Sequence, residues 1–299
     1  MAFRTRKKNS GYDSMLFNMV GYVLVTAVAV ACLVPFLLVL SGSFTSNEAV
    51  VKYGYNFIPK EWSLKAYEVL FNVPTVILNS YLVTIIITLA GTTISLFLTS
   101  MTAFVLHRKD FKYRNGFSFF FFFTTLFSGG LVPWYMLMLK LGMRNSIFAL
   151  IVPGLFSVFN IIIMRTFFTT LPDAISESGK MDGANDFVIY YRLYMPMALP
   201  GLATIGLFIA LGYWNEWYNA MLFITNEKLV PLQYQLYKVM NTAAMAAKVA
   251  QLTGRMPSSV PSETIKLAMV CVTVGPIIFL FPYIQRYFIL GLTIGSVKG

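Results

Sequence analysis

The sequence predicts an all-α integral membrane protein with six transmembrane helices, on three observations. Of its 299 residues, 57% are hydrophobic and only 12% are charged, about half the charged fraction of a typical soluble domain. The apolar residues form blocks of roughly 20 residues or more, the helical length that crosses a hydrocarbon layer of about 30 Å. Runs such as VLVTAVAVACLVPFLLVL and FSFFFFFTTLF are apolar on every face. They do not alternate as the strands of a membrane barrel do, so helices are expected.

Six apolar blocks define the expected transmembrane domain, residues 19–290. The first block follows a basic N-terminus, residues 1–18, which resembles the charged start of a signal peptide. Its apolar run is too long for a signal peptide and no clear cleavage site follows, so a retained first helix is expected. A short tail, residues 291–299, follows the last block. The blocks cover residues 19–40, 76–106, 117–138, 147–168, 199–224 and 265–290.

Lysine and arginine residues predict the orientation in the membrane. Residues 1–14 and the HRKDFKYRN segment after the second block carry four each. Both segments lie directly beside helix ends, where the positive-inside rule has most force. The two termini are therefore expected in the cytoplasm, as is the loop at residues 169–198. The segments at residues 41–75 and 225–264 are then expected outside.

Residue content also excludes several functional classes. Cys32 and Cys271 lie within apolar blocks and match no metal-binding spacing, and His107 is the only histidine. No metal site, bound cofactor or histidine-based catalytic group is therefore expected. The net charge of +11 is attributed to basic loops that face anionic membrane lipid, so no nucleic-acid partner is expected.

The cytoplasmic loop, LPDAISESGKMDGANDFVIYYRLYMPMALP, carries the main functional signal. Asp173 and Glu177 favour the positive N-terminal end of a short helix. Gly183 is expected to end that helix, because glycine readily adopts the left-handed conformation. Asn185 or Asp186 can cap a second short helix. Such a bent pair of helices on the inner membrane face could dock into a groove on a soluble partner and transmit a rigid-body movement.

This loop resembles a known motif. Glu177-Ser-Gly-x-x-Asp-Gly-Ala, followed by Leu193-x-Met-Pro, is similar to the EAA loop of permease subunits in binding-protein-dependent ATP-binding cassette (ABC) importers. Ser178 and Gly179 replace two alanines of that motif, and glycine weakens a helix by about 1 kcal/mol relative to alanine. The resemblance implies that the loop couples the chain to an ATPase subunit. The implied coupling residues are Glu177, Ser178, Gly179, Asp182, Gly183, Ala184 and Pro196.

Four further segments resemble the sugar-importer branch of this family: SGGLVPWYMLMLKLGMRNSIFALIVPG, NIIIMRTFF, YWNEWYNAMLF and GLTIGSVKG. The resemblance implies the type I ABC importer permease fold with a cytoplasmic coupling helix, in the bacterial cytoplasmic (inner) membrane. The implied partners are a second homologous permease subunit, two nucleotide-binding ATPase subunits and an extracytoplasmic solute-binding protein. It also implies that residues 225–264 reach the binding protein and that the C-terminal tail contacts the ATPase subunits. A solvated connector and an unattached tail are the alternatives for these two segments.

The expected role is transport without catalysis by this chain. No G-x-x-x-x-G-K-[ST] phosphate loop is present, so ATP and Mg are expected on the partner subunits and the chain is expected not to be an enzyme. A secondary transporter or a channel subunit is the alternative; intramembrane charges and internal repeats, which would favour a transporter, are almost absent. The implied cargo is an oligosaccharide. Uronate oligomers and neutral, maltodextrin-like glucans both stay open.

A second candidate site lies in the fifth block, at GYWNEWYN. On a helix with about 100° per residue, Asn215, Glu216 and Asn219 fall on one polar face. Either Trp214 or Trp217 could then stack on a sugar ring in the substrate cavity. The alternative is an interfacial belt of aromatic residues, with Glu216 bonded to the second permease subunit.

Overall fold

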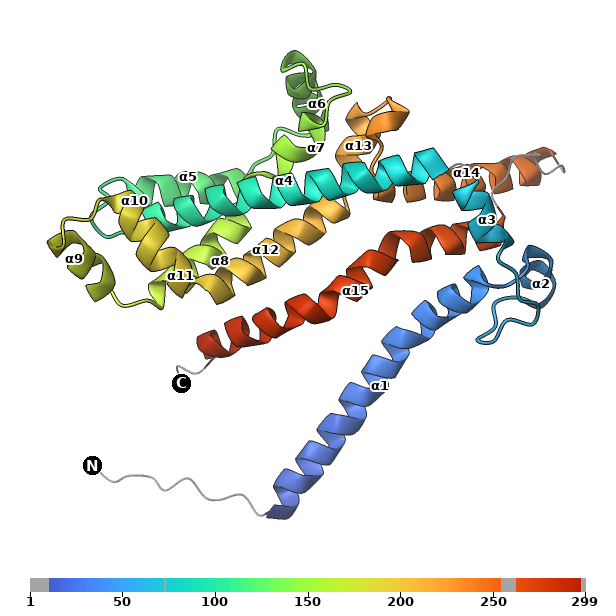
Figure 1. Ribbon diagram of the computed structural model, residues 1–299, viewed down its shortest axis with the longest axis horizontal. Coiled ribbons are helices and arrows are strands. Elements are labelled where there is room, and N and C mark those ends of the chain that lie inside the picture. The colour runs from blue at the N-terminus through green and yellow to red at the C-terminus, as the bar shows by residue number, and fades with distance from the viewer. Residues whose placement is uncertain (1–10, 73, 254–261, 297–299) are drawn as a thin grey trace. The chain divides into compact units, whose positions relative to one another are not determined.

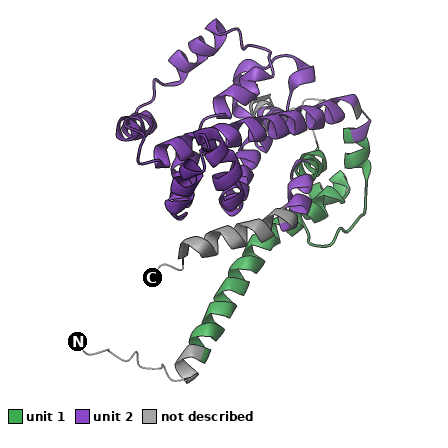
Figure 2. Ribbon diagram, turned by 60° about the vertical axis from the view of Figure 1, so that its left-hand side comes forward, with its two compact units in different colours: residues 1–70, 258–272 green, residues 71–257, 273–299 purple. Residues whose placement is uncertain are grey.

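The computed structural model of the protein describes residues 11–72, 74–253 and 262–296. Within these ranges the chain consists of helices and their connections, and the β pairing is limited to one antiparallel bridge between Thr45 and Trp62. The expected all-α character is therefore confirmed. The chain divides into two compact units (Figure 2). One unit comprises residues 1–70 and 258–272, and the other comprises residues 71–257 and 273–299.

Three helices are long and apolar enough to cross a membrane. Three further apolar stretches are pairs of helices, bent by 114°, 47° and 86° at short breaks. By length and composition, the described residues thus offer three spans, or up to six if each bent pair is one span. The long helices are α1 (Gly11–Ser43), α4 (Pro74–His107) and α15 (Glu263–Ser296). The bent pairs are α5 (Arg114–Leu126) with α6 (Leu131–Lys140), α7 (Phe148–Ile151) and η1 (Val152–Gly154) with α8 (Val158–Thr169), and residues 186–197 with residues 199–223.

A glycine, a capping serine and a proline mark the three bends. Between α5 and α6, Gly130 has a φ of 85°, a left-handed conformation that glycine adopts without strain. The expected helix over residues 117–138 is therefore broken near its middle. Between η1 and α8, the Ser157 side chain caps the new helix by accepting a hydrogen bond from the backbone N–H of Asn160, and Pro200 lies in the first turn of the helix that begins at Leu199. Proline has no backbone N–H and disfavours the helical conformation in the residue before it, so it begins a new helix more easily than it continues one.

In the first unit, the segment after α1 folds around two short helices. The aromatic ring of Tyr67 stacks on Phe44 at a centroid distance of 5.1 Å, and its hydroxyl lies 2.8 Å from that of Ser43. The backbone N–H of Glu263, at the start of α15, donates to the side chain of Asn47. The segment expected outside the membrane is therefore ordered structure, tied to the start of α15. The short helices are α2 (Asn47–Tyr53) and α3 (Lys65–Phe71).

In the second unit, α4 packs along α8 and along α12 (Leu199–Trp214). A Cβ atom at Gly91 of α4 would lie 2.5 Å from the ring of Tyr213 on α12. The absence of a side chain at Gly91 is thus what allows the two helices to approach this closely, as small residues do between membrane helices. The Tyr213 hydroxyl donates to the carbonyl oxygen of Ile151 at 2.8 Å, which joins α7 to the pair.

The two ends of α4 carry different sets of short elements (Figure 1). Toward its N-terminus, Val83 packs with Leu150 of α7 and with Ile224. Toward its C-terminus, Phe104 packs with Tyr194 in a separate buried cluster. The elements at the first end are α13 (Tyr218–Phe223), η3 (Glu227–Leu229) and α14 (Leu232–Thr253). Those at the second end are α9 (Ala174–Met181), α10 (Asp186–Val188), the π-helical turn η2 (Ile189–Tyr194) and α11 (Met195–Met197).

Candidate coupling site

The candidate coupling segment, residues 169–198 and called the coupling segment below, contains the short helix α9. Gly183 follows that helix with a φ of 76°. Its N–H donates to the carbonyl oxygen of Lys180, and the N–H of Ala184 donates to that of Gly179. This pair of bonds is the Schellman arrangement, which requires a left-handed residue at the glycine position. The expectation that Gly183 ends the first helix is confirmed.

The second half of the coupling segment begins at a side-chain cap. The Asn185 side chain accepts a hydrogen bond from the backbone N–H of Val188 at 2.9 Å, so of the two expected caps it is Asn185 that fills the role. The helix that follows is not a regular α-helix, because residues 189–194 form the π-helical turn η2. Such turns are rare and cluster at functional sites. The sequence did not predict it.

The buried residue Gly179 lets α9 lie directly on η2. A Cβ atom at this position would be 3.0 Å from Leu193 and 3.1 Å from Ile189, tighter than ordinary van der Waals contact. The side chain that the resemblance expects, alanine, would therefore have to displace its neighbours. Glycine costs helix stability but brings the two halves of the segment together.

Replacing Gly179 with leucine is expected to lower the thermal unfolding midpoint of the detergent-solubilised chain. Overpacking a close contact costs about 1–3 kcal/mol, here by forcing α9 away from η2. Ser178→Leu is the matched control, since Ser178 lies on the same helix but is exposed. Equal midpoints for the two variants, measured by temperature-dependent size-exclusion chromatography, would contradict the close packing.

Behind η2, two tyrosines connect the segment to the membrane helices. Tyr190 and Tyr194 are both buried. The Tyr190 hydroxyl lies 2.8 Å from the Ser100 hydroxyl on α4. The Tyr194 ring lies 5.0 Å from Phe104 of α4 and 5.7 Å from Phe168 of α8. Because close-packed interiors transmit displacement, a movement of η2 must also move α4 and α8 or break these contacts.

Ion pairs hold the other side of the segment to the end of α4. Arg108, whose side chain is only 10% exposed, pairs with Asp110 and with Asp186 of α10. Lys180 of α9 donates to the same Asp110 carboxylate at 2.6 Å. Hydrogen bonds from Arg108, then from Lys180, lower the pKa of Asp110 well below its usual range. Charge therefore links α9 through the Asp110 carboxylate, and α10 through the Asp186 carboxylate, to Arg108 at the end of α4.

The lowered pKa of Asp110 sets the sign of a pH effect. A carboxyl whose pKa is lower in the folded than in the unfolded state stabilises the fold above about pH 4, and this stability is lost as the pH falls through the folded pKa. The midpoint of the wild-type chain is thus expected to be insensitive to this group between roughly pH 5.5 and pH 8. Below about pH 4 the wild type is expected to lose more stability than Asp110→Asn does. An equal loss in both chains would exclude the carboxylate as the cause.

Most of the coupling residues implied by the resemblance are accessible on this segment. Glu177, Ser178, Asp182, Gly183 and Pro196 are exposed, Ala184 is half-buried and Gly179 is buried. Sequence reasoning missed the apolar part of the same surface. Met181 is 89% exposed, and the exposed rings of Phe187 and Tyr191 lie parallel at a centroid distance of 6.3 Å. Aromatic residues and methionine in a short polar loop are the signal that could have found it, since such residues are enriched in protein interfaces.

The second candidate site has a different geometry from the one expected. The helix stops at Trp214, so the single polar face calculated for a continuous helix is wrong. Trp214 is buried, and its indole N–H donates to the carbonyl oxygen of Thr273 at 3.2 Å.

Glu216 is half-buried and accepts hydrogen bonds from the backbone and side-chain nitrogens of Asn219, at 2.8 and 2.9 Å. Asn215 is exposed, and Trp217 stacks on Tyr237 at 4.6 Å. Sugar contact by these residues stays a prediction.

Replacing Glu216 with glutamine is expected to destabilise the start of α13 by about 1 kcal/mol. The two donors of Asn219 bond to different oxygens of Glu216, and glutamine replaces one of these oxygens with an NH2 group, which cannot accept. Glu227→Gln is the matched control. Glu227 pairs with Lys238 at the surface, and exposed pairs contribute between about 0 and 1 kcal/mol. A larger loss in Glu227→Gln than in Glu216→Gln, measured as the thermal midpoint, would exclude the capping role.

Comparison with known proteins places this geometry in a family. No protein-family profile matches the chain. The polygalacturonan/rhamnogalacturonan transport system permease protein YtcP of Bacillus subtilis (strain 168) is 37% identical over 285 residues, which cover 95% of this chain and 99% of that protein. Protein LplC of the same organism is 35% identical over 95% of each chain.

A solved structure agrees with these relatives. It is the crystal structure of a bacterial ABC transporter involved in the import of the acidic polysaccharide alginate. One of its chains superposes with a TM-score of 0.79 and 30% sequence identity, covering 96% of this chain and all of that one. Relatives this similar along nearly the whole length, together with apolar helices long enough to cross a bilayer, show that the chain belongs to the membrane-embedded permease subunits of ABC sugar importers.

Proposed function

We propose that the chain is one of two permease subunits through which an oligosaccharide enters the bacterial cytoplasm. The proposed partners are a second homologous permease, two ATPase subunits that bind ATP and Mg, and an extracytoplasmic solute-binding protein. The observation that carries this proposal is the structure of the coupling segment. It presents an exposed surface on α9, Gly179 holds α9 against η2, and Tyr190 and Arg108 fix the segment to α4.

Six transmembrane spans are proposed, with each bent helix pair counted as one. The termini and the coupling segment then lie on the cytoplasmic side. The basic residues near His107 support this orientation, since lysine and arginine concentrate on the cytoplasmic ends of membrane helices. α9 is the proposed coupling helix.

The proposed mechanism is a rigid-body displacement. Closure of the ATPase pair on ATP moves α9, with Glu177, Asp182 and the apolar side chain of Met181 as contacts. The close contact at Gly179 carries the movement to η2. The buried ring of Tyr194 then carries it to α4 and α8. Helix shifts of this kind switch a cavity between inward- and outward-facing arrangements.

The proposed cargo is an oligosaccharide that contains uronate units. Support comes from the relatives: one is named for polygalacturonan and rhamnogalacturonan transport, and the similar structure belongs to an importer of alginate, an acidic polysaccharide. Neutral glucans are the alternative. Thermal-shift measurements on the cognate solute-binding protein, with a panel of galacturonate, mannuronate and maltodextrin oligomers, test it. Stabilisation by the neutral oligomers alone would overturn the uronate assignment.

The orientation and the partner can be tested together. Single cysteines placed at Met181 and at Lys60 are labelled in intact cells with a membrane-impermeant maleimide. Met181 is expected to stay unlabelled until the membrane is opened, whereas Lys60, in the segment proposed to lie outside, is labelled directly. With a bifunctional reagent, the cysteine at Met181 is expected to cross-link to an ATPase subunit. Labelling of Met181 in intact cells would exclude the importer mechanism.

A further inference from the structure

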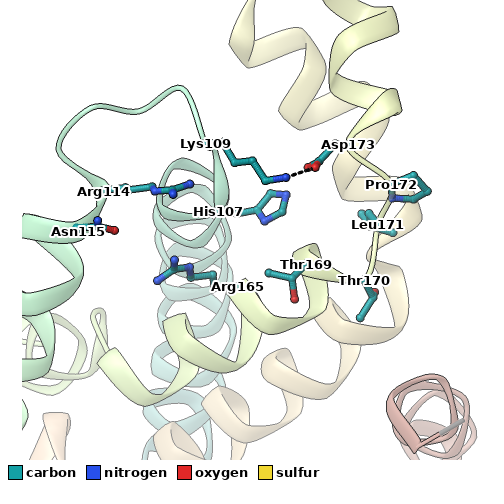
Figure 3. Close-up of a pocket in the computed structure, with 10 residues that line it drawn as sticks. All are labelled: His107, Lys109, Arg114, Asn115, Arg165, Thr169, Thr170, Leu171, Pro172 and Asp173. Atoms are coloured by element: carbon teal, nitrogen blue, oxygen red, sulfur yellow. Dashed lines mark hydrogen bonds and ion pairs between the residues drawn. The ribbon is translucent and has the colours of Figure 1, made fainter. Parts of the chain in front are cut away.

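A basic cavity of 530 Å³ is lined in part by the first residues of the coupling segment, ahead of α9 (Figure 3). Its walls come from the end of α4, the start of α5, the end of α8 and the chain leading into α9. Figure 3 shows Arg114 and Arg165, from different elements, on one side of it and Lys109 extended toward Asp173 on the other. Neither the proposed mechanism nor the relatives assign a role to this cavity.

The cavity carries unbalanced positive charge. Among its lining residues, Lys109 is paired with Asp173, the one carboxylate in the lining. Arg114 and Arg165 take part in none of the ion pairs formed within the described part of the chain. Arg165 donates only a neutral hydrogen bond, to the Ser118 hydroxyl at 3.1 Å. Two guanidinium groups thus remain to be balanced by an anion from outside the chain.

Two further features favour an anion here. The N-terminus of α5 opens beside the cavity, and no side chain caps it, so its unsatisfied N–H groups and helix dipole attract negative charge. Arg165 lies on the apolar helix α8, four residues or about 6 Å before its end. An ionisable residue so close to the hydrocarbon layer usually has a specific partner.

The surface that continues from the cavity is apolar. Phe122 follows Ser118 by four residues on α5 and is 51% exposed. Ile162 precedes Arg165 by three residues on α8 and is 50% exposed. Residues three and four apart share a helix face, so Phe122 continues the face of Ser118, to which Arg165 donates, and Ile162 continues the face of Arg165, both toward the membrane interior. A ligand with a charged head group and an apolar chain fits a basic cavity that continues into an apolar surface better than a free anion does.

We propose that the cavity binds the phosphate of an anionic phospholipid, with Arg114 and Arg165 on the phosphate and an acyl chain along Phe122 and Ile162. Basic cavities between membrane helices at the cytoplasmic side recognise such headgroups, and guanidinium groups bind phosphate through paired hydrogen bonds. The site therefore places a lipid against the chain that enters α9. The lipid proposal rests on the proposed function only because that function places the cavity on the cytoplasmic side of the membrane. Its test needs no ATP.

The test is photo-labelling of the assembled importer in nanodiscs. Phosphatidylglycerol with a photoactivatable acyl chain is expected to label peptides of α5 or α8, and phosphatidylcholine with the same chain is not. Arg114→Gln is expected to reduce the labelling about fivefold, since each arginine near an anionic surface contributes about this factor. Arg165→Lys, which keeps the charge, is expected to retain most of it. Arg144→Gln is the matched control, because Arg144 is exposed and lies outside the cavity.

Four results would overturn the proposal. Labelling that is equal in Arg114→Gln and Arg144→Gln would exclude the cavity. Loss of labelling in excess inorganic phosphate would show a site for a soluble anion. Labelling of the isolated chain that disappears when the ATPase subunits are added would show that a protein covers these arginines. Uptake of sugar is measured in parallel, so that an importer with full uptake and no labelling refutes the lipid site and leaves the permease function standing.

Discussion

Replacing Gly183 with proline is expected to reduce substrate-stimulated ATP hydrolysis by the assembled importer more than tenfold. The φ of 76° at this residue is closed to proline, whose ring fixes φ near −65°. Proline also removes the N–H that Gly183 donates to Lys180. Both effects destroy the bend that folds α9 back onto η2. The measurement is ATPase activity in proteoliposomes with and without loaded binding protein.

Gly183→Asn is the matched control. A Cβ atom at Gly183 would have no other atom within 4 Å, so space does not limit the side chain, and asparagine tolerates the left-handed conformation better than other residues do. It is expected to keep most of the coupling. Membrane content of each variant is compared by immunoblot to separate coupling from expression. Full coupling in the proline variant would refute the role of the bend.

Sequence analysis could predict the helix end and the helix cap in the coupling segment because both depend on nearby residues. Gly183 and Asn185 act on backbone groups within four residues of themselves, so their residue types alone predict a helix end and a cap. The apolar blocks were predictable for a similar reason, since crossing a bilayer requires length and apolar composition whatever the neighbours. The family resemblance then suggested the proposed coupling role, which no local rule supplies.

The features that sequence analysis missed depend on distant residues. Arg108 and Asp186 are 78 positions apart, so neither predicts the other. The same holds for Asn145, whose side-chain oxygen accepts hydrogen bonds from Thr225 and Asn226. The error at Glu216 has another cause: a periodic calculation assumes that the helix continues, and here the helix ends at Trp214.

The ion pairs of Arg108 lead to the second large expected effect. Arg108→Gln is expected to uncouple ATP hydrolysis from transport, with a raised basal rate and several-fold slower uptake. The substitution removes the pairs to Asp110 and Asp186 and the guanidinium that lies 5.7 Å from the centre of the Phe104 ring. Because both carboxylates are about half or more exposed, solvent screens them and the expected loss of stability is only about 1–2 kcal/mol. The mechanical effect is larger, since α10 loses its charged link to α4.

A double-mutant cycle separates this link from a general loss of charge. If Arg108 acts through Asp186, then Asp186→Asn adds little to the uptake defect of Arg108→Gln, as expected for residues in one network. Lys112→Gln is the matched control: it removes a cation from the same short connection, but Lys112 forms none of the ion pairs found among the described residues. Additive defects in the cycle, or an equal defect in Lys112→Gln, would show that Arg108 contributes only positive charge. Non-additivity confined to the Arg108–Asp186 pair would instead identify the end of α4 as the point where movement of α9 and α10 reaches the membrane helices.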